Sequence, residues 1–229
     1  MTVARCTLAA LMLAAAVPAS AATYNLATDW NAGANPSGAW SFLSGSTLLP
    51  YWDAMPPLSG SGGFAPSPDF GYFLPVFWQS GGSGTEILVH SYDGYNGNGA
   101  SGEAILTWTS PATGTMDLSG YFYYGQPTLA RSNDVAIALD GNTLLSTTVS
   151  STQHQDSASR YSFSFDDLAV VAGETLKISF VRTAGHAPGT VTVMDVTVTT
   201  QPVPEPATWV LMLGGLGVAG WLGRRRPVA

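Results

Sequence analysis

The sequence has 229 residues, of which 45% are hydrophobic and only 10% are charged, with a formal net charge of −7. Between residues 22 and 201 four basic residues stand against fourteen acidic ones, which gives this body a net charge of −10. Such an acidic surface suits a secreted protein and argues against nucleic-acid binding, because phosphates need a basic footprint.

The first 21 residues have the features of a secretory signal peptide. Arg5 supplies a short basic start, residues 8–17 form an apolar run, and Pro18 ends this run before the small residues of Ala19-Ser20-Ala21. The apolar run is too short for a spanning helix, so we expect cleavage after Ala21, with Ala22 as the next choice. Cys6 is the only cysteine and leaves with the signal, so the body from 22 to 201 has neither disulfides nor a thiol nucleophile.

The segment from residue 23 to 98 is dense in glycine, proline, serine and aromatic residues. Candidate strands there are 24–29, 40–43, 71–78 and 86–90, and we expect them to supply edge strands and long loops of the same domain. Trp30, Trp40 and Trp108 lie in apolar or strand-like contexts, so they are assigned to the core.

Several loop aromatics in this segment are candidates for carbohydrate binding, since rings stack on sugar faces while neighbouring polar groups orient hydroxyls. The candidates are Trp52 with Asp53, Trp78 with Gln79, and Tyr92 and Tyr95 around Asp93. The alternative is that these aromatics only cap the ends of the fold, because large aromatic side chains are mostly buried.

The loop from residue 93 to 99 is a weak calcium candidate. Asp93, Asn96 and Asn98 offer side-chain oxygens, and Glu103 follows. Calcium takes six to eight oxygen ligands, but the spacing differs from that of an EF-hand. A plain Gly/Asn turn is the alternative, and the sequence indicates no other metal or cofactor.

From residue 103 onward, short strands alternate apolar and polar residues and are separated by turns. Val135, Ile137 and Leu139 alternate up to Asp140-Gly141-Asn142, which predicts a hairpin. In the last strand, residues 190–200, the apolar parity shifts between Val193 and Val196, which indicates a bulge or a strand buried on both faces. This pattern predicts one all-β, antiparallel sandwich or barrel spanning residues 22–201.

We find no catalytic constellation in the sequence, and the protein is expected not to be an enzyme. His90, His154 and His186 lie in three separate segments, and neither a Gly-x-Ser-x-Gly elbow nor a His-Glu-x-x-His zinc motif occurs. The carboxylate pair Asp166-Asp167 would face opposite sides of a strand, so we expect it to start a turn.

The C-terminal 28 residues, 202–229, combine three features in a fixed order. Pro204-Glu205-Pro206 comes first, an uncharged apolar run from 207 to 223 follows, and Arg224, Arg225 and Arg226 come last. The run is near the short limit for a transmembrane helix, and the arginines indicate a cytoplasmic end. It has the features of a temporary membrane anchor that another protein recognises.

This tail resembles the PEP-CTERM sorting signal, and its three parts match that signal position by position. The resemblance implies recognition by an exosortase, a membrane processing enzyme, and association with exopolysaccharide production. The same tail is also labelled an ice-binding protein C-terminal domain, although nothing in the body repeats like an ice-binding face.

Parts of the body resemble other secreted PEP-CTERM proteins. The segment Asn35-Pro36-Ser37-Gly38-Ala39-Trp40-Ser41 is similar to their Asn-Pro-Asn-Gly-x-Trp-Ser segment, and residues 105–122 and 134–141 are similar to later segments. The resemblance implies a jelly-roll-like β-sandwich, preceded by a cleaved signal helix and followed by the membrane helix.

The expected function is a secreted or surface-sorted, non-catalytic component of an exopolysaccharide or biofilm matrix, anchored in the membrane at least transiently. A carbohydrate-binding module with a defined glycan site is the alternative. A hydrolase that acts on surface polysaccharide is the third hypothesis.

Overall fold

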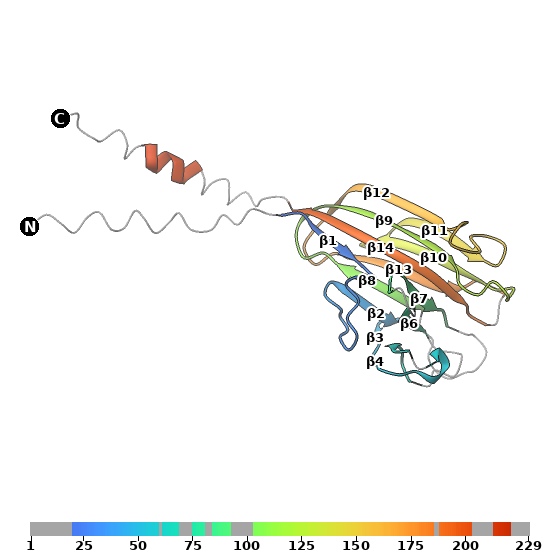
Figure 1. Ribbon diagram of the computed structural model, residues 1–229. Helices are drawn as coiled ribbons and strands as arrows, with labels where there is room; N and C mark the ends of the chain where they lie inside the picture. Colours follow the sequence, from blue (N-terminus) through green and yellow to red (C-terminus); the bar gives the residue numbers. More distant parts are fainter. Residues whose placement is uncertain are drawn as a thin grey trace, which may run out of the picture.

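Two antiparallel β-sheets lie face to face in the part of the chain that the structure describes (Figure 1). The computed structural model describes residues 20–59, 61–68, 75–80, 84–92, 103–185, 188–202 and 213–220. The prediction of an all-β antiparallel sandwich is confirmed.

The first sheet, sheet A, has the strand order β12-β9-β14-β7-β6-β5-β4, and β1 also pairs with β14. Its described strands are β1 (Ala22–Asn25), β4 (Tyr51–Trp52), β5 (Gly63–Phe64), β6 (Val76–Gln79), β7 (Ile87–His90), β9 (Gly114–Tyr124), β12 (Tyr161–Val170) and β14 (Val191–Pro202). The second sheet, sheet B, has the order β11-β10-β13-β8-β2-β3. Its described strands are β2 (Trp40–Ser44), β3 (Thr47–Leu48), β8 (Ala104–Thr109), β10 (Ser132–Leu139), β11 (Asn142–Ser150) and β13 (Thr175–Arg182).

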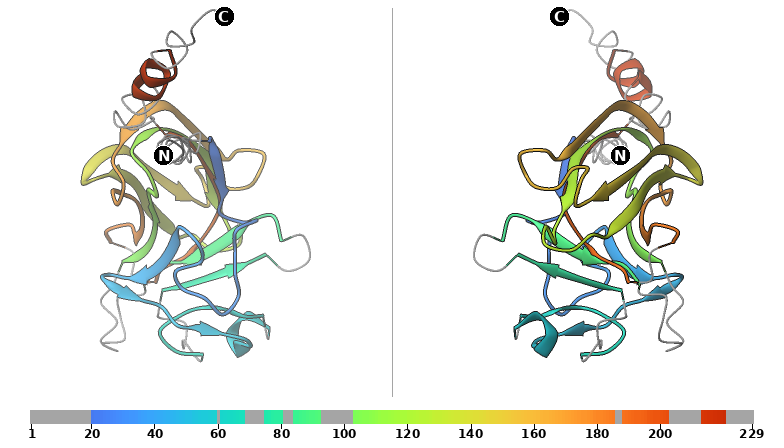
Figure 2. Two further views of the ribbon diagram at one scale, coloured as in Figure 1. Left: turned by 90° about the vertical axis from the view of Figure 1, so that its left-hand side faces the viewer. Right: turned by 90° about the vertical axis from the view of Figure 1, so that its right-hand side faces the viewer.

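The N-terminal half contributes more than the edge strands expected from its sequence. β3 and β4 do lie at sheet edges, but β7 pairs directly with β14 inside sheet A. The strand expected over 24–29 ends at Asn25, because the Asn25 side chain accepts a hydrogen bond from the Thr28 amide and closes a turn. Figure 2 shows β4, β5 and the short 3-10 helix η1 (Pro56–Leu58), in blue-green, at one side of the sandwich.

The hairpin predicted at Asp140-Gly141 joins β10 to β11. Both turn residues have positive φ, 46° for Asp140 and 79° for Gly141, as a type I′ turn requires. The segment that resembles Asn-Pro-Asn-Gly-x-Trp-Ser is also structural. The Asn35 amide donates to the carbonyls of Phe42 and Leu49 at 2.7 and 2.8 Å, which fixes the chain before and after β2.

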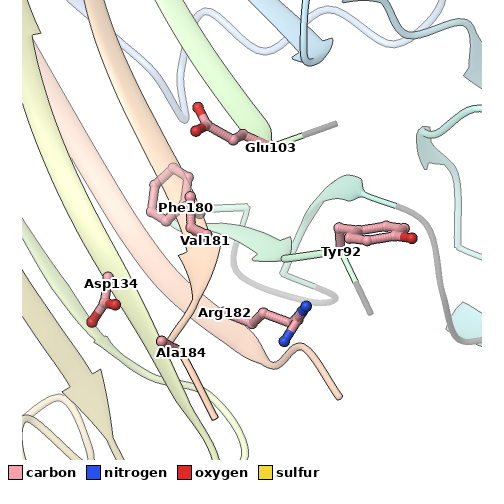
Figure 3. A pocket seen from close by; sticks show the side chains of 7 residues that line it. All are labelled: Tyr92, Glu103, Asp134, Phe180, Val181, Arg182 and Ala184. Atoms are coloured by element: carbon pink, nitrogen blue, oxygen red, sulfur yellow. The ribbon is translucent and has the colours of Figure 1, made fainter. Parts of the chain in front are cut away.

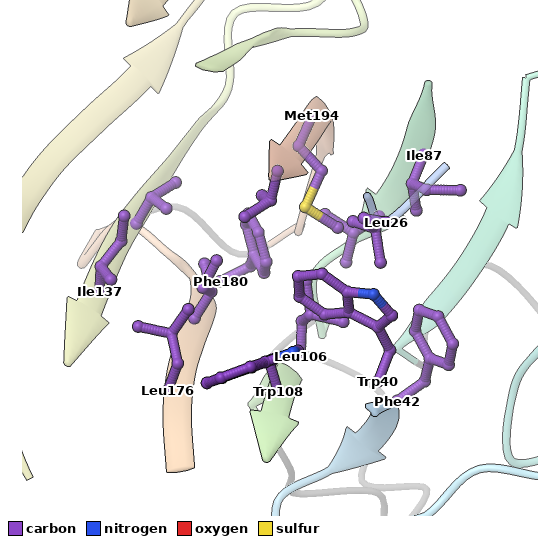
Figure 4. Packing of buried hydrophobic residues seen from close by; sticks show 14 of the residues in the cluster. Leu26, Trp40, Phe42, Ile87, Leu106, Trp108, Ile137, Leu176, Phe180 and Met194 are labelled. Carbon is purple, nitrogen blue, oxygen red and sulfur yellow. The ribbon is translucent and has the colours of Figure 1, made fainter. Parts of the chain in front are cut away.

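The core lies between the sheets and is rich in aromatic rings (Figure 4). Trp40 and Trp108 are 1% and 0% exposed, and Trp30 packs against the same cluster, so the predicted core positions of all three are confirmed. Phe42 of sheet B stacks on Phe64 of sheet A with ring centroids 4.5 Å apart, a contact that joins the two layers. Offset aromatic contacts of this kind contribute about 0.5–1.5 kcal/mol beyond the burial of their area.

Two sequence irregularities have clear structural causes. The register of β14 against β9 runs without a shift from Thr192 to Pro202, and both Val193 and Met194 are buried. Of the two alternatives for this strand, burial on both faces is therefore correct. Asp166-Asp167 does not start a turn: it forms a bulge inside β12, where the Asp167 amide donates to the Asp117 carboxylate at 2.9 Å.

The start of β1 and the end of β14 lie side by side at one end of the sandwich (Figure 1). Ala22, the residue after the expected signal cleavage, pairs with Thr200. Beyond β14 the structure describes only residues 213–220, which are helical, within the predicted membrane helix 207–223. No helix among the described residues is long and apolar enough to span a membrane.

Candidate functional site

Trp52 and Trp78 come together on the outer face of sheet A, the side that points away from sheet B. Phe64 and Phe77 point into the main core, so their strand neighbours point outward. There Met55, Ala65 and Val76 form a second, small buried cluster, against which Trp52, Leu58 and Trp78 pack. The sequence analysis gave the two tryptophans as separate candidates for carbohydrate binding, and the structure shows that both pack against the same small cluster.

The local geometry makes these indoles partly structural. The Trp52 Nε1–H donates to the carbonyl of Ala65 at 2.9 Å. At Gly63, between the two indoles, an added Cβ would lie 2.6 Å from the Phe77 carbonyl and 3.2 Å from the Trp78 Cβ. Only glycine fits at this close approach, so the cluster is tightly packed beneath partly buried rings. Asp53 follows Trp52 and is exposed.

Tyr92 lies apart from the tryptophans, in an open pocket of about 400 Å³ (Figure 3). The other lining residues come from β10 and β13, from the position before β8 and from the chain after β13: Glu103, Asp134, Phe180, Val181, Arg182 and Ala184. The Arg182 guanidinium points toward the side of the pocket where the Tyr92 ring lies (Figure 3). A volume of this size is typical of small-molecule sites.

The two carboxylates of the pocket are already engaged by the protein. Asp134 accepts hydrogen bonds from the hydroxyls of Thr148 and Thr183 at 2.7 and 2.9 Å. Glu103 forms an exposed ion pair with Lys177 at 3.1 Å. The pocket is therefore shaped by an aromatic ring and a cation, with its carboxylates tied to neighbouring strands.

A buried polar network fixes the residues next to the pocket. The Ser91 hydroxyl donates to Asn133 Oδ1 at 2.6 Å, and Asn133 Nδ2 donates to the Thr190 carbonyl and the Thr192 hydroxyl at 2.9 and 3.0 Å. Ser91 precedes Tyr92 and Asn133 precedes Asp134, so this network sets the spacing between the two sides of the pocket.

His90 borders this network and is nine-tenths buried. Burial lowers the pKa of His90 to about 4; a Ser91 backbone hydrogen bond opposes this effect, and the Arg131 charge adds to it. Among the described residues, none forms a hydrogen bond with its Nδ1. A neutral imidazole fits a structural role for His90, which is the last residue of β7.

A third cluster, which the sequence did not reveal, lies on the outer face of sheet A around Glu86. The hydroxyls of Tyr121 and Tyr123 donate to Glu86 Oε1 and Oε2, each at 2.9 Å. Desolvation and this hydrogen bond raise the pKa of Tyr123 to about 12, and the pKa of Tyr121 is raised in the same way. The only sequence signal was the i, i+2 spacing of two tyrosines on one strand face.

The remaining predicted site residues lie outside the described residues. These are Tyr95 and the calcium candidates Asp93, Asn96 and Asn98, together with the tail residues Pro204, Glu205, Pro206, Arg224, Arg225 and Arg226. Within the part of the chain that the structure describes, no group of three or more His, Cys, Asp or Glu residues is placed to hold a metal ion.

The comparison with family models agrees with the predicted tail. Residues 202–226 match the model of the PEP-CTERM protein-sorting motif. No curated protein matches the chain.

Several solved structures are similar to this chain at low sequence identity. The K2 cleaved adhesin domain of Lys-gingipain is 11% identical, covering 80% of this chain and 100% of its own, with a TM-score of 0.41. The xylan-binding module CBM15 is 9% identical, covering 80% and 99%, with a TM-score of 0.37. The C-terminal CBM6 of LamC, a laminarinase from Zobellia galactanivorans, is 11% identical, covering 70% and 99%, with a TM-score of 0.32.

Proposed function

Since the chain carries a PEP-CTERM protein-sorting motif, which implies exosortase-mediated sorting to the cell surface, we propose that it is a non-catalytic, structural or adhesive component of an exopolysaccharide matrix. The observation that carries the proposal is the position of the motif. It begins at residue 202, where β14 of the acidic sandwich ends, so the sorting signal is joined directly to a folded domain.

The composition of the domain supports a role outside the cell. The body has no cysteine, and its net charge of −10 keeps a secreted protein soluble while it awaits attachment. We expect the tail to act as a temporary anchor, with the mature chain ending near Pro206.

Intact-mass measurement on the protein isolated from its native host tests the processing step. A mass that corresponds to a chain from Ala22 to about Pro206 is expected. If most molecules still end at Ala229, processing of the tail is rejected.

Cell fractionation tests the role in the matrix. Cells that express the full chain should retain the protein in the matrix fraction, whereas a chain ended at Gln201 should appear in the medium. Replacement of Arg224, Arg225 and Arg226 by alanine should impair membrane retention and orientation, because the basic end sets topology. Equal distribution of all three proteins would contradict a matrix role that depends on the tail.

A carbohydrate-binding module is the second candidate, and the pocket beside Tyr92 is the observation that favours it. An aromatic ring and a guanidinium border a hollow of about 400 Å³. A glycan array with the sandwich from Ala22 to Pro202, which contains every described strand, tests this candidate. Tyr92→Ala is the suitable variant, because Trp52→Ala would also remove the hydrogen bond to Ala65 and disturb the fold.

A further inference from the structure

The cluster around Glu86 is built across the middle of sheet A. Ile87 pairs with Met194 of β14, and Tyr121 of β9 pairs with Asp195, so the Glu86 side chain reaches over β14 to the tyrosines of β9. Each carboxylate oxygen accepts one hydroxyl at 2.9 Å. Since a carboxylate offers about four acceptor positions, Glu86 retains capacity for further donors.

The aromatic part of this cluster is held rigidly. The rings of Tyr121 and Tyr123 stack with centroids 6.2 Å apart and planes inclined by 18°. The Arg160 guanidinium lies 4.5 Å from the centroid of Tyr121, so one of the four basic residues of the body is committed to this stack. A surface whose side chains are fixed before binding loses less conformational entropy when a ligand binds.

The polar cluster continues into an apolar row on the same face. The strand register places Tyr123 opposite Val193, Val193 opposite Leu88, and Leu88 opposite Trp78. Because the strand neighbours of these residues point into the core, all four side chains lie on the outer face. Three of them, Tyr123, Leu88 and Trp78, are partly exposed, whereas Val193 is covered.

Beneath Glu86 lies a second acceptor. Asp195 is half-buried and accepts hydrogen bonds from Asn25 Nδ2 at 3.1 Å on both of its oxygens. The two carboxylates lie close enough that the Glu86 charge adds to the effect of burial in raising the pKa of Asp195. This face carries two carboxylates against the one guanidinium of Arg160, on a body with a net charge of −10, so it disfavours anions.

We propose that the outer face of sheet A, from Tyr121 and Tyr123 with Glu86 to Leu88 and Trp78, binds an uncharged glycan. The carboxylate of Glu86 accepts hydrogen bonds from sugar hydroxyls, and the apolar row contacts the sugar faces. Polysaccharides that carry carboxylates are excluded by the two acidic side chains. The inference rests on the proposed matrix role and names the class of ligand that would hold the protein there.

Affinity electrophoresis of the sandwich from Ala22 to Pro202 tests the proposal. The gels contain soluble β-glucan, xylan or galactan as uncharged probes, and polygalacturonate as the anionic probe. At least one uncharged polymer should retard the protein, and polygalacturonate should not. Absence of retardation by every uncharged polymer, or retardation by polygalacturonate alone, would overturn the proposal.

Variants locate the binding surface. Tyr123→Ala should weaken binding at least tenfold, and Glu86→Gln should weaken it while leaving the apolar row intact. Tyr123→Phe keeps the ring, so it should weaken binding less than Tyr123→Ala does; this separates loss of the contact surface from loss of the hydroxyl. Thermal melting of each variant identifies any that fails to fold.

Leu48→Ala is the control, because Leu48 is an exposed residue of β3 at the edge of sheet B, and it should leave binding unchanged. Tyr92→Ala tests the separate pocket as the alternative site. If Tyr92→Ala abolishes binding and a folded Tyr123→Ala does not, the pocket is the glycan site and this proposal is wrong. Cell fractionation stays informative in either case, since sorting by the tail does not depend on Tyr123.

Discussion

Acidification should destabilise the sandwich through His90, and the structure gives the size of the effect. The buried imidazole has a pKa of about 4 in the folded protein, whereas an unperturbed histidine has a pKa of about 6.5. Below pH 6.5 the His90 side chain becomes protonated in the unfolded chain, whereas in the folded chain it stays neutral until the pH approaches 4. Stability is therefore intact above the unfolded pKa and falls as the pH drops toward the folded pKa.

The magnitude follows from the two pKa values. Each unit of difference corresponds to about 1.4 kcal/mol, so at pH 4.5 His90 lowers the free energy of unfolding by roughly 2–3 kcal/mol relative to pH 7.5. For a domain with a total stability of about 5–15 kcal/mol, such a loss is measurable.

Urea unfolding of the sandwich at pH 7.5 and pH 4.5, monitored by tryptophan fluorescence, measures this difference. His90→Leu removes the titrating group, and it suits a position that pairs with Val76 and Val191. The variant should lose roughly 2–3 kcal/mol less than the wild type on acidification. Leu48→Ala, at an exposed position of β3, keeps the imidazole in place; it is the control and should show the wild-type loss. An equal acid-induced loss in His90→Leu and wild type would refute the assignment.

Three further outcomes are expected. Asn133→Ala should lower the free energy of unfolding by about 1–3 kcal/mol in urea titrations, because the Ser91 hydroxyl loses its buried acceptor; a change below 0.5 kcal/mol would contradict the role of the network. Gly141→Ala should cost about 1 kcal/mol because φ is +79°, and an unchanged urea midpoint would count against a strained turn. If Asp93, Asn96 and Asn98 hold calcium, the melting temperature should rise with calcium and fall with chelator, and identical melting curves would discard that site.

The parts of the fold that depend on neighbouring residues could be predicted from the sequence. The Asp140-Gly141 hairpin follows from turn chemistry, and the alternation in β10 and β13 follows from burial of one strand face. The bulge at Asp167 could not be predicted in this way. Its cause is the Asp117 carboxylate, fifty residues earlier, which accepts the Asp167 amide.

The candidate sites show the same limit more strongly. Glu86 and Tyr121 are 35 residues apart in the chain, and only the strand order of sheet A brings them within hydrogen-bonding distance. Trp52 and Trp78 were recognised individually as aromatic candidates, but their shared cluster depends on the pairing of β4, β5 and β6. The sequence therefore identified individual candidate residues, but which of them lie together could be known only from the order of the strands in the sheet.

The pairing of β14 determines how the domain would carry mechanical load. Tension from an anchor on the C-terminal side enters at Pro202, the last residue of β14. This strand pairs with β9 along eleven consecutive residue pairs, from Thr192 to Pro202. Inter-strand hydrogen bonds lie perpendicular to the strands, so a pull along β14 loads them together in shear. A terminal strand loaded in this way should resist separation better than one that peels away one hydrogen bond at a time.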